Sequence, residues 1–171
     1  ILIFSALMVQ AQNNASASNG TGNGNSFWDK MVINIDFQKG TKNKGMSPMS
    51  FGCQIGYQFV PHLYAFAYFE NTVGLYNRNQ VKTYTNTPNL GGGLGYRYPI
   101  EDDLMLEFRG LVAASVDNKD WKQTVYDARV LIGLSRCVCR PTFGLGYRHI
   151  ASHTTGIDNY NGLYASIGIS F

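Results

Sequence analysis

The sequence predicts an all-β fold, an eight-stranded, antiparallel, up-and-down transmembrane β-barrel. Apolar and polar residues alternate over segments of about ten positions, and this pattern recurs along the chain. Only 15% of the residues are charged, whereas 13% are aromatic and 19 are glycine. Such a composition suits short strands joined by glycine-containing turns better than a soluble helical protein. With 171 residues the chain has room for one domain.

The first 26 residues are expected to precede the barrel. Residues 1–11 are interpreted as a truncated signal peptide, because an apolar run too short to span a bilayer ends in Val9-Gln10-Ala11. Small side chains there occupy the positions that signal peptidase reads, so cleavage is expected after Ala11. Residues 12–26 are mostly polar and predict a flexible leader. The alternative, a buried first strand at the start, accounts less well for this polar stretch.

Residues 27–171 contain the strands. The alternation is clearest at 49–59, where large apolar side chains from Met49 to Phe59 alternate with small or polar ones from Ser50 to Gln58. Successive side chains of a strand point to opposite faces, so one face of this segment is apolar and the other is polar. The same division occurs at 31–38, 90–98, 104–115, 126–135, 143–148 and 163–171. A further strand at 63–73 is so aromatic that its faces are ambiguous.

The composition of the two faces decides which one is outside. One face carries Phe, Tyr, Leu and Ile, whereas the other carries Gly, Ser, Gln, Asp, Glu and Arg in most strands. An eight-stranded barrel has an interior only just wide enough for side chains, so the large apolar residues are expected outside. A continuous apolar belt on the outer wall requires lipid around it. The pattern therefore predicts a barrel that spans a membrane.

Short and long connections alternate along the chain. The short ones, at 60–62, 99–103 and 136–141, each contain a proline. The longer and more polar ones lie at 39–48, 74–83, 117–123 and 152–161. Short periplasmic turns and longer extracellular loops are typical of outer-membrane barrels, so both chain ends are expected on the periplasmic side.

Several short motifs support this class. They are Gly93-Leu94-Gly95-Tyr96-Arg97, its near-copy Gly144-Leu145-Gly146-Tyr147-Arg148, the related Gly56-Tyr57-Gln58, and the C-terminal Ile169-Ser170-Phe171. With them, 27–171 resembles the small outer-membrane β-barrels of the OmpA/OmpX type, often labelled porin-family. Phe171, with Ile167 and Ile169, resembles the signal read by the barrel assembly machinery, although Ser166 stands where that signal often has Gly. The resemblance implies the outer membrane of a Gram-negative bacterium, with its lipid and lipopolysaccharide as surroundings.

The predicted inner face gathers charges of both signs. They are Asp36, Arg97, Glu107, Arg109, Asp127, Arg129 and Arg148, and an inward Glu70 would make four cations and four anions. Adjacent strands are expected to bring Arg97 near Glu107. The next hairpin is expected to bring Glu107 and Arg109 near Arg129 and Asp127. Because such pairs can satisfy one another, the charges predict a polar plug, with a filter for anions or protons as the alternative.

The predicted outer loops are basic. Lys39, Lys42 and Lys44 lie in the first, and Arg78 and Lys82 in the second. These cations could neutralise lipopolysaccharide phosphates or attract another anionic surface ligand, although ordinary solvated loops explain them equally simply. Trp121 is expected to be either a contact residue or, preferably, an anchor at the membrane interface.

His149 and Ser152 raise an enzymatic hypothesis. Lipid A deacylases, which are also small outer-membrane barrels, are similar in having a His and a Ser near the outer end of a late strand. In that family the two residues are two positions apart, whereas here that position holds Ala151 and the pair would need a β-bulge. The sequence therefore predicts no catalytic residues and no cofactor.

The three cysteines are interpreted as incidental small residues. Cys137 and Cys139 are too close for an unstrained disulfide and too few for a metal site, and Cys53 is distant in the sequence. A net charge of +3 is also too small to indicate nucleic acid as a partner. The sequence thus predicts a monomeric barrel with a structural or surface-interaction role through its extracellular loops. A narrow pore for small solutes and a lipid A-modifying enzyme are the alternatives.

Overall fold

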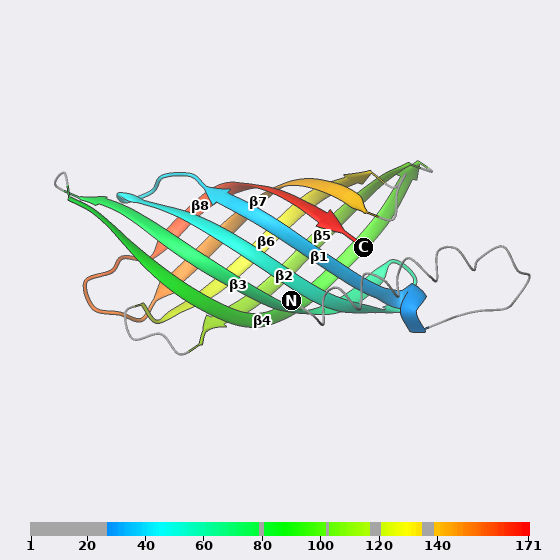
Figure 1. Cartoon of the computed structure of the whole chain (residues 1–171), viewed down its shortest axis with the longest axis horizontal. Coiled ribbons are helices and arrows are strands. Elements are labelled where there is room, and N and C mark those ends of the chain that lie inside the picture. The colour runs from blue at the N-terminus through cyan, green and yellow to red at the C-terminus, as the bar shows by residue number, and fades with distance from the viewer. Residues whose placement is uncertain (1–26, 79–80, 102, 117–120, 135–138) are drawn as a thin grey trace, which may run out of the picture.

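The computed structural model is a closed β-barrel of eight antiparallel strands, in which each strand pairs with its neighbours in the sequence (Figure 1). The structure describes residues 27–78, 81–101, 103–116, 121–134 and 139–171, with the backbone alone at 76–78 and 81–84. The predicted signal peptide at 1–11 and the leader at 12–26 lie outside the described residues. Within the described ranges, no helix is long and apolar enough to cross a membrane.

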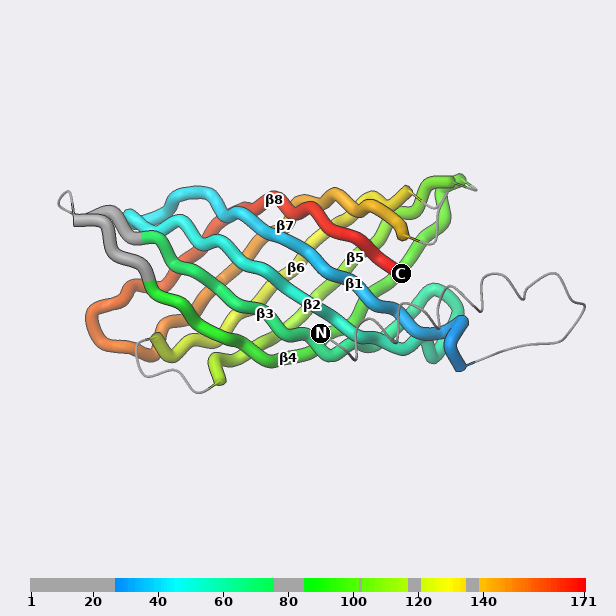
Figure 2. The backbone as a smooth tube through the Cα atoms, in the orientation of Figure 1, coloured from blue at the N-terminus to red at the C-terminus, as the bar shows by residue number. Residues whose placement is uncertain are grey.

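The barrel begins after a short 3₁₀ helix, η1 (Phe27–Lys30). Its strands are β1 (Met31–Gly40), β2 (Met46–Val60), β3 (Leu63–Arg78), β4 (Val81–Glu101), β5 (Leu104–Ser115), β6 (Gln123–Leu134), β7 (Arg140–Ser152) and β8 (Tyr160–Ser170). β1 pairs with both β2 and β8, which closes the barrel. The strands run obliquely to the long axis (Figure 2), as closure of a sheet requires. The predicted fold class is confirmed.

The side chains alternate between the two faces of the wall as the sequence predicts. On β2, Phe51 is 57% exposed, whereas Gln54 is 1% exposed. Because successive strand residues point to opposite faces, the polar series fills the interior and the apolar series forms the outer belt. β3, whose faces were ambiguous, follows the same division, since Tyr64, Tyr68 and Glu70 are buried while Phe69 is half exposed.

The two ends of the barrel differ in their connections. We name the end with the connections at 41–45 and 153–159 the loop end, and the end with Pro61–His62 and the C-terminus the turn end (Figure 1). The first hairpin closes tightly, because Lys44 and Gly45 have φ angles of 46° and 81°. Positive φ at both central residues is the geometry of a type I′ turn, which matches the twist of the flanking strands.

Two predicted loops are shorter in the structure. The predicted loop at 39–48 shrinks to 41–45, so Lys39 lies on β1 rather than in a loop. The predicted loop at 74–83 is largely strand, because β3 continues to Arg78 and β4 begins at Val81. Apolar alternation marks only the part of a strand that meets lipid. Backbone pairing continues beyond it, supported here by the Thr and Tyr residues that favour strands.

Trp121 corrects the expectation of a surface residue at this position. It is fully buried, in a hydrophobic cluster at the loop end that also contains Val125, Ile150 and Tyr160. Its Nε1 donates a hydrogen bond to Ser152 Oγ at 3.2 Å, the kind of partner that a buried indole requires. The prediction of a contact residue or interface anchor is therefore wrong, and Trp121 helps to close the loop end instead.

Candidate functional site: the charged lumen

Eight charged side chains from six strands meet inside the barrel. They are Asp36 (β1), Glu70 (β3), Arg97 (β4), Glu107 and Arg109 (β5), Asp127 and Arg129 (β6), and Arg148 (β7). All seven residues that the sequence predicts for the inner face are there, and Glu70 joins them. The strand period of two places them, since the residues on either side of each one point to the outer face of the wall.

The first half of the network joins β4, β5 and β1. Arg97 Nε lies 3.3 Å from Glu107 Oε2, and Arg109 Nε lies 2.5 Å from Glu107 Oε1. Arg109 also lies 3.9 Å from Asp36 across the lumen. Its Nη1 donates hydrogen bonds of 3.1 Å to Asn34 and Gln54. Glu107 thus holds two arginines, and one of them reaches the opposite wall.

The second half continues from Asp36 to the loop end. Arg129 Nη1 lies 2.7 Å from Asp36 Oδ2, and Arg129 Nε lies 3.5 Å from Asp127 Oδ1. Arg148 lies 2.9 Å from Asp127 and 3.1 Å from Glu70. Because β1 and β6, and β7 and β3, are not neighbours in the barrel, these ion pairs connect opposite walls.

The network is a single chain of alternating charge. Its order is Arg97, Glu107, Arg109, Asp36, Arg129, Asp127, Arg148 and Glu70. Each buried cation has at least one anion beside it, and four charges of each sign balance. Buried ions are tolerated only when they are paired in this way. The charged side chains of the lumen are therefore neutralised by one another.

The hairpin of β5 and β6 forms only part of the predicted arrangement. Its register places Arg109 opposite Arg129 and Leu131 opposite Glu107, and among the described residues no ion pair joins Glu107 to Arg129. Asp36 separates the two arginines, since it lies 2.7 Å from one and 3.9 Å from the other. A strand from the far wall thus neutralises a like-charge pair that the hairpin alone would create.

Three buried tyrosines complete the network and were not predicted from the sequence. Their hydroxyls donate to its carboxylates, with Tyr68 bonding Glu70 at 3.1 Å, Tyr164 bonding Asp127 at 2.7 Å, and Tyr64 bonding Glu107. Arginine guanidinium groups lie over the same rings, Arg97 at 5.0 Å from the centroid of Tyr64, Arg129 at 5.4 Å from Tyr68 and Arg148 at 5.1 Å from Tyr164. Each ring therefore supports a cation with its face and an anion with its hydroxyl.

The repeated Gly-Tyr-Arg motif explains two of these sites. At Gly95-Tyr96-Arg97, the glycine and the arginine point inward, and the register pairs Gly95 with Tyr64 of β3. The ring of Tyr64 occupies the space that a side chain at position 95 would need. The arginine two residues later then stacks on that ring. The absence of a side chain at Gly95 thus leaves room for the ring of Tyr64, and that ring provides the surface on which Arg97 packs.

The second copy of the motif forms the same unit elsewhere in the barrel. The register pairs Gly146 with Tyr164 of β8, whose ring fills the space beside the glycine. Arg148, two residues after the glycine, stacks on it at 5.1 Å. The repeat in the sequence is therefore a repeated packing unit of the lumen, and it is the signal that could have identified the tyrosines.

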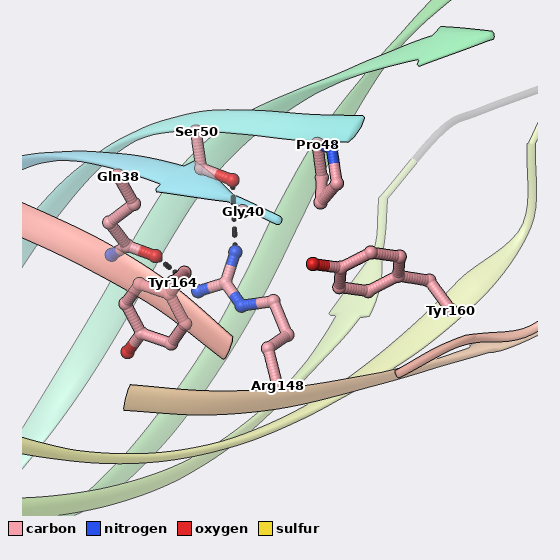
Figure 3. Close-up of a pocket in the computed structure, with 7 residues that line it drawn as sticks. All are labelled: Gln38, Gly40, Pro48, Ser50, Arg148, Tyr160 and Tyr164. Carbon is pink, nitrogen blue, oxygen red and sulfur yellow. Dashed lines mark hydrogen bonds between the residues drawn. The ribbon is translucent and has the colours of Figure 1, made fainter. Parts of the chain in front are cut away.

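A small cavity at the loop end adjoins the network (Figure 3). Arg148 lies within it and donates hydrogen bonds to Gln38 Oε1 at 2.5 Å and Ser50 Oγ at 2.9 Å. The aromatic rings of Tyr160 and Tyr164 complete its lining. Its volume is about 10 Å³, which is room for a single water molecule. The network thus reaches a small hollow at the loop end of the lumen.

Comparisons with known proteins agree with this architecture. The N-terminal β-barrel domain of Pseudomonas aeruginosa OprF matches with a TM-score of 0.50 and 11% identity, covering 83% of this chain and 96% of that chain. This chain has the fold of a small outer-membrane β-barrel. OprH of P. aeruginosa matches with a TM-score of 0.47 and 15% identity, covering 83% and 98% of the two chains. Yersinia pestis Ail matches with a TM-score of 0.44 and 13% identity, covering 83% and 99%.

The likeness to these outer-membrane barrels concerns the fold alone. No protein family and no curated protein matches the sequence. A fold hosts many functions, so the residues of this barrel carry the functional argument.

The cationic residues predicted for the outer loops belong to two hairpins of the loop end. Lys42 and Lys44 are exposed in the first connection of the loop end, and Lys39 is exposed on β1 beside it. Arg78 and Lys82 belong to the β3–β4 hairpin, where Arg78 pairs with Val81 and Lys82 with Asn77. Their side chains lie outside the described residues.

The residues of the enzymatic hypothesis do not come together. His149 Nδ1 lies 2.5 Å from Asn161 Oδ1, whereas Ser152 Oγ accepts from Trp121 and lies 3.4 Å from the backbone of Thr154. The pairing of β7 with β6 and β8 continues through this region without a register shift. The bulge that would align His149 with Ser152 is therefore not present in β7.

The remaining candidate residues have simple surroundings. Cys53 is a half-buried free thiol and Cys139 an exposed one, while Cys137 lies outside the described residues. In the part of the chain that the structure describes, no three His, Cys, Asp or Glu side chains are grouped to hold a metal ion. Ile167 and Ile169 are exposed on the outer wall, and the backbone of Phe171 bonds Ile33 of β1 in both directions, at 2.8 and 3.3 Å.

Proposed function

We propose that the protein is an integral outer-membrane barrel of a Gram-negative bacterium, with a plugged lumen and a structural, surface-interactive role at its loop end. The observation that carries the proposal is the continuous ion chain through the lumen. It connects opposite walls, and the cavity at its outer end has room for about one water. A barrel closed in this way acts on its surroundings through its outer surface.

The loop end carries the groups suited to such a role. Lys42 and Lys44 are exposed at the tip of the first hairpin, and Lys39 is exposed on the outer face of β1. A cluster of ammonium groups beside an anionic leaflet attracts its phosphates, with about 1 kcal/mol for each lysine near the surface. The partner supported by this charge is lipopolysaccharide, whose phosphates the lysines would neutralise.

Lipopolysaccharide binding tests the proposal directly. Folded wild-type protein and the double variant Lys42→Gln/Lys44→Gln are compared for binding to lipopolysaccharide with and without its phosphates. Two lysines at about 1 kcal/mol each predict a loss of affinity of about 30-fold. Removing the phosphates should weaken the wild type to a similar extent. Lys30→Gln, at the turn end, is the matched control and should leave the affinity unchanged.

Two results would contradict this role. Equal affinity of the wild type and the double variant would remove the lysines as the contact. A loss of lipid A acyl chains on expression, dependent on His149 and Ser152, would favour the enzymatic alternative instead. We expect acyl composition to be unchanged, because these two side chains have separate partners.

A further inference from the structure

A groove of about 550 Å³ runs along the outer wall across β4, β5, β6 and β7. Its volume lies within the roughly 300–1,000 Å³ of sites that hold small molecules. Gly110 and Ala128 provide its shallow floor on the outer face. The large exposed side chains around them, Leu94, Val112 and Tyr147, form its sides. The groove therefore interrupts an otherwise bulky apolar belt.

Gly110 is not required by the packing of the barrel. A Cβ at Gly110 would meet no protein atom within 4 Å. By contrast, a side chain at Gly93 on the neighbouring strand would collide with the backbone of β5. Glycine within a strand costs stability and commonly marks a place where another molecule approaches closely. Because Gly110 faces outward, a molecule that packs against it would lie outside the barrel wall.

The loop end of the groove has a polar border. Tyr126 and His149 line the groove there, and their rings pack with centroids 5.8 Å apart. Asn161 Oδ1 lies 2.5 Å from His149 Nδ1 and 3.4 Å from Tyr147 Oη. His149 is thus held at Nδ1 by Asn161, and its Nε2 is not part of this contact. Hydrogen-bonding groups therefore lie at the loop-end edge of this lipid-facing surface.

The polar border extends one step further toward the loop end. Thr124, two residues before Tyr126 on the same face of β6, lies 3.0 Å from His153 Nε2. Among the described residues, this border presents hydroxyl, amide and imidazole groups, followed toward the loop end by the exposed Lys122. Such groups match the hydroxyls and amides of a sugar headgroup more closely than a bare phosphate.

We propose that this groove binds one acyl chain of an outer-leaflet glycolipid, with the sugar headgroup at His149 and Asn161. The apolar floor accepts the chain, and the polar border accepts the headgroup at the depth where the belt ends. The inference rests on the proposed position in the outer membrane, with the loop end outward. It involves a site separate from Lys42 and Lys44.

A second copy of the barrel fits the groove less well. A neighbouring outer wall would bring another apolar belt against Tyr126, His149 and Asn161. The polar atoms that are not bonded within this group, such as His149 Nε2 and the hydroxyl of Tyr126, would then lose water as a partner, which costs free energy for each one. A lipid fits the groove better, because its apolar chain can lie on the apolar floor while its polar headgroup lies at the polar border.

Native mass spectrometry of the folded full chain in detergent tests the site. The probes are hexa-acylated lipid A and a phosphatidylethanolamine with chains of similar length. Gly110→Leu places an apolar side chain in the groove, and its Cβ meets no protein atom within 4 Å, so the barrel should fold, as checked by a mobility shift on heating in SDS. Ala165→Leu, on the outer face of β8, is the matched control outside the groove. Asn161→Ala tests the headgroup border.

We expect one lipid A to remain bound to the wild type and to Ala165→Leu. Gly110→Leu should lower the bound fraction at least tenfold, and Asn161→Ala should weaken lipid A several-fold while leaving phosphatidylethanolamine unchanged. If Gly110→Leu retained as much lipid A as the wild type, the groove would not be the binding site. If the wild type bound phosphatidylethanolamine as well as lipid A, the groove would not be specific for a glycolipid. A wild-type dimer that Gly110→Leu disrupts would assign the groove to a second copy. Lys42→Gln/Lys44→Gln should not change binding in the groove, which separates this test from that of the proposed function.

Discussion

Asp36 is the residue on which the two halves of the lumen network depend. It lies between Arg109 and Arg129 and reaches both from the far wall. Asp36→Asn should destabilise the folded barrel by about 3–5 kcal/mol, because it leaves two buried cations with less compensation. Adding Arg129→Met should recover part of the loss, with a coupling of about 0.5–3 kcal/mol. Urea unfolding of the refolded protein in lipid vesicles measures both.

The control for this cycle is a carboxylate in water. Asp158 is exposed in the β7–β8 connection, so Asp158→Asn should change stability by no more than about 0.5 kcal/mol. A second cycle with Glu107→Gln and Arg129→Met should give a smaller coupling, because Arg109 and Asp36 separate these side chains. Strict additivity of Asp36→Asn and Arg129→Met would show that the ion chain is not connected through Asp36.

Two glycines of adjacent strands provide a matched pair of substitutions. Gly95→Ala should displace the ring of Tyr64 and destabilise the barrel by about 1–3 kcal/mol, as overpacking does. Gly110→Ala should be neutral or stabilising by up to about 1 kcal/mol, since the new Cβ meets open space. Unfolding free energies of the two variants test this difference. A similar cost at both positions would mean that backbone freedom, not the tyrosine ring, explains Gly95.

The strand period predicts which residues face the lumen, but not which residues they contact there. Parity alone predicts Asp36, Arg97 and Arg148 inside, and in the structure all three belong to the ion chain of the lumen. Contacts across the lumen depend on the stagger of all the strands around the barrel, which no local pattern encodes. For that reason the sequence suggested Glu107 with Arg129, whereas closure brings Asp36 between the arginines.

At the scale of the strands, the sequence predicts positions well and lengths poorly. The alternation at 90–98 marks the part of β4 that faces lipid, yet β4 extends from Val81 to Glu101. The added residues at 81–89 pair with β3 although their sequence has no regular apolar alternation, because ladder hydrogen bonds need no particular side chain. Prolines do not mark the strand ends either, since Pro48 and Pro88 both lie within strands.

Phe171, which follows the last strand, leads to a separate prediction about assembly. Phe171 pairs with Ile33 through its backbone, where β8 and β1 close the barrel. Phe171→Gly keeps these two hydrogen bonds while removing the ring. We expect less folded protein in the outer membrane of cells, but an unfolding midpoint close to that of the wild type after refolding in vitro. The aromatic side chain would then act in recognition by the assembly machinery rather than in stability.

Two measurements decide between recognition and stability at this position. Phe171→Tyr retains an aromatic ring and should assemble as the wild type does. Equal amounts of folded wild type and Phe171→Gly in the outer membrane would contradict the recognition role. A large drop in the unfolding midpoint of Phe171→Gly would instead assign the ring to the packing of the barrel.

For the whole molecule, closure of the wall and closure of the lumen have different causes. The wall is closed by the pairing of β1 with β8, which leaves no free strand edge in the membrane. The lumen is crossed by long arginine side chains, since Arg109 and Arg129 both reach Asp36 on the far wall. Shortening the crossing side chains should therefore open a path while leaving the wall intact.

Conductance in planar bilayers tests this separation. The wild type should show no steady channels, because ion pairs from opposite walls occupy the lumen. Arg109→Ala/Arg129→Ala should show them, since two crossing side chains are lost and the remaining carboxylates repel one another. Both proteins should shift in mobility on heating in SDS, which confirms a folded wall. Steady channels from pure wild type would favour the pore alternative. A silent but folded double variant would mean that the tyrosines Tyr64, Tyr68 and Tyr164, rather than the arginines, block the lumen.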